Sequence, residues 1–129
     1  MNKSGDNAIL DKSFLFAIRT IKLYQYLCSE HKEYVLSKQV LRSGTSIGAN
    51  AEEAHGGISD ADFSNKISTS YKEARETKYW LRLLHATGYI ETKMFDSLFA
   101  DCDELSKISF SILEKTRISK GRKNSSEKK

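Results

Sequence analysis

The sequence predicts an all-α fold, an antiparallel up-down-up-down four-helix bundle, and three observations support this prediction. The 129 residues contain no proline, so long helices can run without interruption. Apolar side chains recur with helical periodicity in four segments. The connections between these segments, at about residues 30–33, 56–58 and 87–91, are short enough to make consecutive helices antiparallel neighbours.

The first predicted helix, residues 9–29, carries apolar side chains on two opposite faces, with Asp11 or Ser13 as a candidate N-cap. The face expected to point toward the core comprises Phe14, Ala17, Ile18, Ile21, Tyr24 and Cys28. The face expected to point outward comprises Phe16, Leu23 and Leu27.

The second predicted helix, residues 34–55, has one narrow apolar stripe and ends at Gly56-Gly57. The stripe consists of Leu36, Val40, Gly44, Ile47, Ala51 and Ala54. A polar row beside it consists of Gln39, Ser43, Ser46, Asn50 and Glu53. This row is either solvated or a polar seam between helices or subunits, and the sequence leaves both interpretations open.

The third and fourth predicted helices, residues 59–86 and 91–117, complete the bundle. Ser59 and Asp62 resemble a capping box, Gly88 is the expected stop, and Thr92 is a candidate cap. The inner face of the third helix is Phe63, Ile67, Ala74, Thr77, Leu81 and Leu84. That of the fourth is Met94, Leu98, Leu105, Ile108 and Ile112.

The basic character of the chain comes from its C-terminal end. Seven of the 21 Lys/Arg and one of the 17 Asp/Glu lie in residues 115–129, so this segment carries +6 and residues 1–114 carry −2. We therefore expect a bundle domain over residues 1–117 and a basic, disordered tail over residues 118–129. The tail residues expected to contact phosphates are Lys120, Arg122 and Lys123.

Several classes of protein are disfavoured by what the sequence lacks. There is no signal-peptide core and no apolar run of about 18 residues, so a cytoplasmic location without membrane partners is expected. Cys28 and Cys102 are expected to be free thiols. The three histidines fall at opposite ends of the predicted bundle, so neither a metal nor another cofactor is expected.

Residues 44–48 form a literal G-x-S-x-G, the pattern of a serine-hydrolase nucleophile. That chemistry requires a strand before Ser46, whereas the preceding residues have helical periodicity, so no enzymatic activity is expected. The alternative is close helix packing, in which Gly44 and Gly48 admit bulky neighbours such as Phe14 and Tyr24, or Phe63 and Tyr71. The predicted packing motif is Gly44, Ser46, Ile47, Gly48 and Asn50.

Apolar and basic residues on the outer faces suggest two kinds of partner. Apolar residues in excess of the core predict an oligomer interface, unless curved packing buries them within one chain. The interface candidates are Phe16, Leu23, Leu27, Tyr79, Trp80 and Leu83, and Phe99 and Phe110 repeat the pattern. The candidates for phosphate contacts are Arg42, Lys72, Arg75, Lys78 and Arg82, although a mixed surface helix explains the third-helix charges equally simply.

The segments EYVLSKQVLRSGTSIGANAEEA and SDADFSNKISTSYKEARETKYWLRLLHATGYI resemble the four-helix-bundle proteins encoded in intervening sequences of 23S ribosomal RNA genes. The resemblance covers roughly residues 13–113. It implies a homopentameric ring and a family without established enzymatic activity. The fold also resembles the accessory variability protein of diversity-generating retroelements, a pentamer that engages nucleic acid and a reverse transcriptase.

The function hypothesis from the sequence is therefore a non-enzymatic oligomeric bundle that binds RNA or DNA, or a nucleic-acid-processing partner. The alternative is a protein–protein interaction scaffold with no affinity for nucleic acid.

Overall fold

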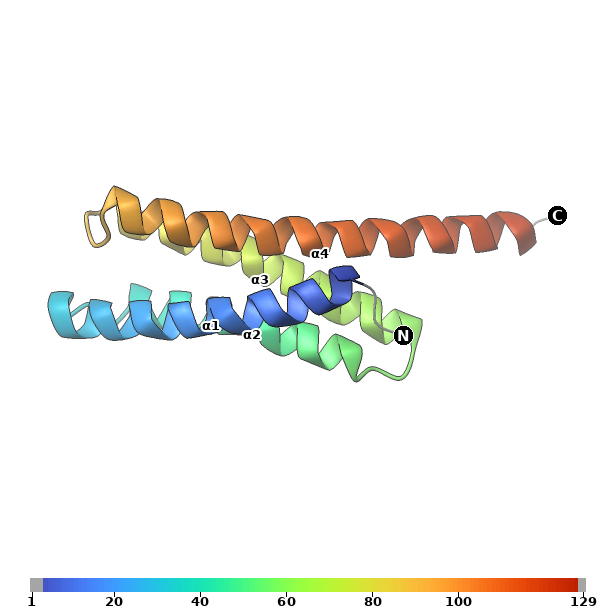
Figure 1. The fold of residues 1–129 in the computed structure, drawn as a ribbon, viewed down its shortest axis with the longest axis horizontal. Coiled ribbons are helices and arrows are strands. Elements are labelled where there is room, and N and C mark those ends of the chain that lie inside the picture. Colours follow the sequence, from blue (N-terminus) through green and yellow to red (C-terminus); the bar gives the residue numbers. More distant parts are fainter. Residues whose placement is uncertain (1–3, 128–129) are drawn as a thin grey trace.

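The structure is a computed structural model that describes the backbone of residues 4–127 and the side chains of residues 8–116. It consists of four helices, α1 (Ser4–His31), α2 (Leu36–His55), α3 (Asp60–Ala86) and α4 (Thr92–Glu127). Each helix packs on the next one in sequence, and α1 also packs on α4. In Figure 1, α1 and α4 lie in front of α2 and α3. The predicted all-α four-helix arrangement is confirmed.

The helix ends follow local capping chemistry. The Ser59 hydroxyl accepts a hydrogen bond from the Asp62 N–H at 3.0 Å, which is the predicted start of α3. Gly88 has a φ of 85°, a left-handed conformation that suits glycine and ends α3. The predicted caps of α1 are wrong, because the helix begins at Ser4, and Ser13 is buried in the interior.

The start of α2 uses a cap that the sequence analysis missed. The Glu33 carboxylate accepts hydrogen bonds from the backbone N–H groups of Val35, Leu36 and Ser37 at 3.1, 3.0 and 2.7 Å. Partial burial raises the pKa of Glu33, but the three N–H donors outweigh that effect and hold it below its ordinary value. A carboxylate three residues before the helix thus satisfies donors that have no partner within α2.

The orientation of α1 is the opposite of the predicted one. Phe16, Leu23 and Leu27 are buried in the core, whereas Phe14, predicted to be inside, has 63% of its surface exposed and Ile18 and Ile21 are also exposed. The physical reason is the composition of the buried stripe, which includes two small polar residues that lowered its apparent hydrophobicity. Its members are Ile9, Ser13, Phe16, Thr20, Leu23 and Leu27.

The other three helices bury the faces that the sequence predicts. On α2 the buried stripe includes Val40, Ile47 and Ala51. On α3 it includes Ile67, Ala74, Thr77, Leu81 and Leu84. On α4 it includes Leu98, Leu105 and Ile112. Cys102 joins this core and donates to the Ala74 carbonyl at 3.2 Å. Burial raises the pKa of the Cys102 thiol to about 12, so this thiol stays protonated and unreactive at neutral pH.

The fourth helix is longer than predicted. It continues to Glu127, beyond the expected boundary at residue 117, and extends past the other three helices in Figure 1. The side chains of Lys120, Arg122 and Lys123 lie outside the described residues, so their contribution to a basic tail stays a prediction.

Candidate nucleic-acid interface

Ser46 lies in the middle of α2, with no strand among residues 4–127. Its hydroxyl donates to the Arg42 carbonyl of the preceding turn at 2.7 Å, and the Asn50 side chain in turn donates to the Ser46 carbonyl at 2.8 Å. Both side chains are half-buried, not enclosed by neighbouring helices. The G-x-S-x-G pattern therefore does not form a nucleophile elbow, which needs a strand-to-helix turn.

At the two glycines of the motif α1 lies close to the backbone of α2, but the neighbouring side chains are small. A Cβ at Gly44 would lie 2.5 Å from Thr20 Cγ2 and 2.6 Å from Thr20 Oγ1. A Cβ at Gly48 would lie 3.1 Å from Ser13 Oγ. The prediction of bulky aromatic neighbours is wrong at these two positions, because the two backbones come so close that only small side chains fit between them.

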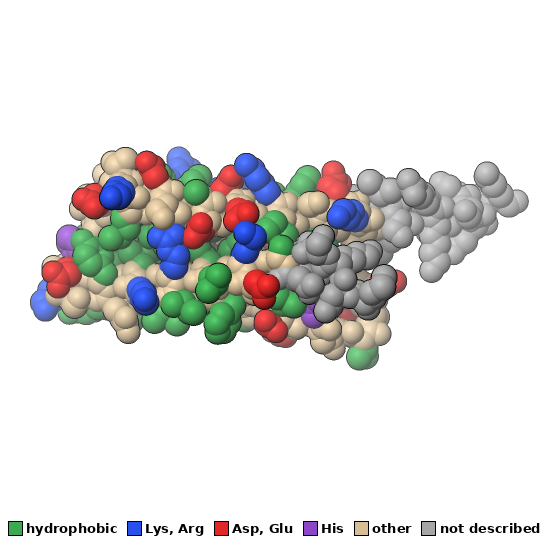
Figure 2. All heavy atoms as spheres, viewed as in Figure 1, with side chains coloured by type: hydrophobic (Ala, Val, Ile, Leu, Met, Phe, Trp, Pro, Cys, Tyr) green, Lys and Arg blue, Asp and Glu red, His purple; other side chains and the backbone are tan. Residues whose placement is uncertain are grey.

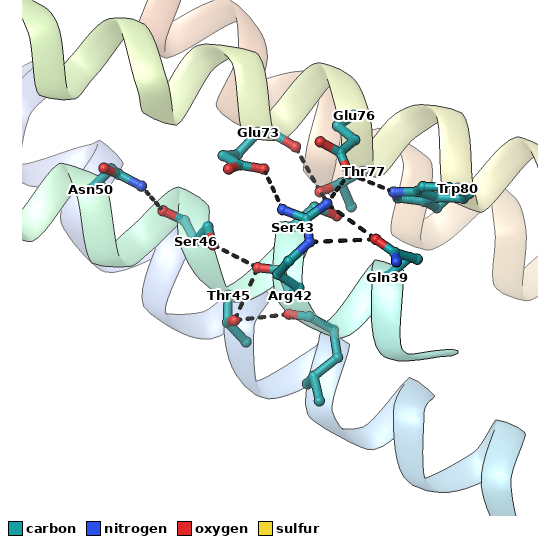
Figure 3. A network of polar contacts seen from close by, with 11 residues as sticks. Gln39, Arg42, Ser43, Thr45, Ser46, Asn50, Glu73, Glu76, Thr77 and Trp80 are labelled. Carbon is teal, nitrogen blue, oxygen red and sulfur yellow. Dashed lines mark hydrogen bonds and ion pairs between the residues drawn. The ribbon is translucent and has the colours of Figure 1, made fainter. Parts of the chain in front are cut away.

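The polar row of α2 is partly a seam with α3 (Figure 3). The buried Ser43 and Thr77 hydroxyls are joined at 2.8 Å, and the buried Ser70 hydroxyl donates to the Ile47 carbonyl at 2.8 Å. Further along the row, Glu53 pairs with Lys66 of α3 at 3.2 Å. These contacts favour the seam interpretation over a fully solvated row.

Arg42 takes part in the contacts of this seam. Its guanidinium pairs with Glu73 at 3.4 Å and with Glu76, and it donates to the Gln39 side chain at 3.3 Å (Figure 3). Glu76 also accepts a hydrogen bond from the Trp80 indole N–H at 2.9 Å. A phosphate would have to displace two carboxylates to reach Arg42, so the geometry does not favour the predicted phosphate contact at this residue.

The other predicted basic residues of α3 come together in one surface groove of about 610 Å³, which we call the basic groove. Its lining is Lys72, Arg75, Glu76, Lys78, Tyr79, Arg82 and Phe99. Six of these seven residues come from α3, and Phe99 comes from α4. The groove therefore contains four cations, two aromatic rings and one carboxylate, and that carboxylate already pairs with Arg42.

The four cations of the groove differ in how they are compensated. Lys78 pairs with Asp103 at 2.7 Å and lies over the Phe99 ring, 5.3 Å from its centroid. Hydrogen bonds from Lys78 and Lys107 lower the pKa of Asp103, so this carboxylate is charged at neutral pH. The remaining three, Lys72, Arg75 and Arg82, form no ion pair with any described side chain.

The aromatic residues near the groove were predicted to form an oligomer interface. Tyr79 has 51% of its surface exposed and lines the groove, whereas Trp80 and Leu83 are half-buried. The Tyr79 and Trp80 rings meet edge to face, with their centroids 5.2 Å apart. Arg75 lies over the ring of Tyr71, 5.9 Å from its centroid. The basic groove thus combines positive charge with accessible π surfaces.

A second surface feature is an apolar strip on the outer side of α1. Phe14, Leu15, Ile18 and Ile21 are all exposed there. Figure 2 shows hydrophobic side chains along α1 on the viewed face of the molecule. The predicted interface residues Phe16, Leu23 and Leu27 are not part of this strip, because they lie in the core. The sequence did predict a surplus apolar face on this helix, but assigned it to the wrong side.

The described residues contain neither a metal-binding cluster nor a membrane-spanning helix. Among the described residues, no group of three or more His, Cys, Asp or Glu side chains could hold a metal ion. None of the helices, over the same residues, has an apolar stretch long enough to cross a bilayer.

Comparison with known proteins agrees with the resemblance in the sequence. A family model described as 23S rRNA-intervening sequence protein matches residues 5–111. A crystal structure of a protein of unknown function from the S23 ribosomal protein family of Bacteroides thetaiotaomicron VPI-5482 is 50% identical, with a TM-score of 0.84, and the match covers 85% of this chain and 98% of that chain. No curated protein matches this chain. Because the family model spans most of the sequence, and a crystal structure that is 50% identical matches 85% of it, the chain belongs to the 23S rRNA-intervening sequence protein family.

Proposed function

We propose that this protein is a non-enzymatic, homo-oligomeric bundle that binds RNA or DNA through the basic groove. The observation that carries the proposal is the convergence of four cations in one groove, three of which form no ion pair with any described side chain. Lys72, Arg75 and Arg82 are exposed, so their charges are accessible to an external anion. A polyphosphate backbone would compensate all three and release counterions.

The distribution of charge supports a local contact surface. Residues 1–114 carry a net charge of −2, so attraction to nucleic acid cannot come from the overall charge of the bundle. It would come from the groove, with the basic residues beyond residue 114 adding a contact that is independent of sequence. Contacts of this kind position a protein on a phosphate backbone without reading bases.

The apolar strip of α1 supports self-association. Exposed apolar residues in a contiguous strip mark a surface that is covered by a partner. We propose that a second copy of the chain covers it, in a closed homopentameric ring as the family resemblance implies. A ring needs two different complementary faces on each subunit, and the half-buried Trp80 and Leu83 supply apolar area for the second face. A protein partner on the same strip would instead fit the scaffold function.

The test compares two variants of equal charge by fluorescence anisotropy with a labelled oligonucleotide. One removes the three unpaired groove cations (Lys72→Ala, Arg75→Ala, Arg82→Ala). The matched control removes Lys22, Lys38 and Lys93, three exposed lysines on α1, α2 and α4. The groove variant should make the negative slope of log K against log salt shallower by about two to three, because each lost phosphate contact removes about 0.7–0.9 from its magnitude. The control should leave the slope nearly unchanged.

Three outcomes would contradict the proposal. Equal losses in both variants would mean that only net charge matters. A full loss of binding in a third variant, Lys120→Gln, Arg122→Gln, Lys123→Gln, with the groove intact, would assign the affinity to the C-terminal residues. If the wild-type protein binds no nucleic acid at low salt, the scaffold function is the better explanation.

A further inference from the structure

We propose that the basic groove selects single-stranded nucleic acid, with the Tyr79 ring as a stacking platform for one unpaired base. This inference rests on the proposed function and adds to it the form of the ligand. The observation behind it is that the cations of the groove surround an exposed aromatic ring, the combination that sequence-tolerant single-strand binding sites use.

The Tyr79 ring is accessible, yet it is supported by neighbours. Half of its surface is exposed, and the Trp80 ring packs against it at 5.2 Å. Trp80 is in turn fixed by its hydrogen bond to Glu76, which pairs with Arg42. This chain of contacts runs from α2 through α3 to the ring. A ring that is already held loses little conformational entropy when a base stacks on it.

The cations lie on both sides of the ring along α3. Arg75 precedes Tyr79 by four residues and Arg82 follows it by three, so both lie on the same face of the helix, one turn away in each direction. Lys72 extends this row by a further turn. At a rise of 1.5 Å per residue, the row from Lys72 to Arg82 is about 15 Å long, enough for a backbone of a few nucleotides.

A duplex has no exposed base face that could stack on the Tyr79 ring. In a duplex the faces of the bases are covered by their neighbours, so a duplex can use only the cations of the groove. A single strand can use the cations and also turn one base onto the ring. Glu76 does not oppose the backbone with an uncompensated charge, because Arg42 pairs with it. The difference in affinity between the two forms should therefore depend on the ring.

The experiment measures binding of the full-length protein to three probes of equal length: a single strand, the same strand with abasic sites, and the duplex. Tyr79→Ala should weaken binding to the intact single strand by roughly 5- to 150-fold, the range measured for loss of one stacked base. Its effect on the abasic strand and the duplex should be less than about twofold. Tyr79→Phe keeps the ring and should restore binding to within a few-fold of wild type.

The controls separate this inference from the proposed function. Light scattering on Tyr79→Ala should show an unchanged particle size; dissociation of the oligomer would place Tyr79 in a subunit interface and overturn the stacking role. Equal losses on intact and abasic strands would also overturn it, as would tighter binding of wild type to the duplex, while in both cases the groove would remain a binding site. Failure of the wild type to bind any probe would overturn both proposals.

Discussion

The contact between α1 and α2 and the basic groove of α3 differ in how completely the chain satisfies its own groups. Between α1 and α2, the Thr20 hydroxyl donates to the Phe16 carbonyl at 2.8 Å, and there is no room for a Cβ at Gly44. In the groove, three cations form no ion pair with any described side chain, and half of the Tyr79 surface is exposed to solvent. The groups of the first region are satisfied within the chain, whereas those of the groove are exposed to solvent.

This difference separates residues that determine stability from residues that are available for binding. Where every group has a partner and all space is filled, a substitution must change the free energy of unfolding. Where charged and aromatic side chains are exposed, a substitution should change the fold little and should act mainly on what the surface can bind. The same contrast exists within α1 alone, between its buried face and its apolar strip.

The largest effect is expected from a pair of phenylalanines two residues apart on α1. Phe16→Ala should lower the free energy of unfolding by about 3–5 kcal/mol, because it leaves a cavity in the core where Phe16 is 2% exposed. Phe14→Ala removes the same side chain from the strip, where it is 63% exposed, and should lower the stability of the subunit by less than about 1 kcal/mol.

Urea unfolding at matched protein concentration measures the stability difference, and light scattering reports particle size. Phe14→Ala should reduce the size of the assembly if the strip is a subunit interface. The reverse ranking of the two stabilities would show that α1 packs through its Phe14 face, as the sequence periodicity first suggested.

A smaller effect is expected from the two glycines of α2. In Gly44→Ala, the new Cβ would meet both branches of Thr20, so turning this side chain gives no relief, and we expect a net loss of about 1–2 kcal/mol. In Gly48→Ala, the Ser13 hydroxyl at 3.1 Å has to move by only a few tenths of an ångström. The gain of up to about 1 kcal/mol in helix propensity should offset this strain.

Chemical denaturation of the two variants checks the ranking. Adding Thr20→Ala to Gly44→Ala removes both clashing atoms, so the double variant should be more stable than the sum of the two single effects predicts. Additive losses would mean that Thr20 is not what limits space at Gly44.

The fold could be predicted from the sequence because four long periodic segments and short connections leave few arrangements. The buried faces of α2, α3 and α4 followed from periodicity. On α1 the same method failed, since two apolar faces compete and the correct one contains Ser13 and Thr20. Ser13 and Thr20 can be buried because Gly48 and Gly44 of α2 lie opposite them. Periodicity within α1 alone cannot predict this, because it depends on the residues of a neighbouring helix.

The candidate site was predictable only in part, for a similar reason. Helical spacing places Lys72, Arg75 and Arg82 on one outward side of α3. Spacing could not show that Arg42 is neutralised by Glu73 and Glu76, because those carboxylates come from another helix. Whether a charge is free or paired depends on which helix lies beside it.

The smallest effect is expected at Glu33, whose charge, unlike those of the groove, has all its partners within the chain. Its pKa is below the ordinary value in the folded protein, so its contribution to stability is fully present above its unfolded pKa of about 4.3. The contribution disappears as the pH falls through the lower folded value, because the protonated acid no longer accepts three hydrogen bonds as an anion.

Glu33→Gln should therefore lower the free energy of unfolding by about 0.5–1 kcal/mol at pH 7, the size of an ordinary helix cap. The difference from wild type should shrink as the pH falls below the unfolded pKa and should vanish once the pH lies below the lowered folded pKa, where the carboxyl is protonated in both states. Urea unfolding across this pH range measures the difference, with Glu30→Gln as the control for loss of a carboxylate outside the cap. A Glu33→Gln deficit that stays constant as the pH is lowered from 7 until the wild type unfolds would show that the side-chain amide fails for reasons of shape, and that the charge of Glu33 does not stabilise α2.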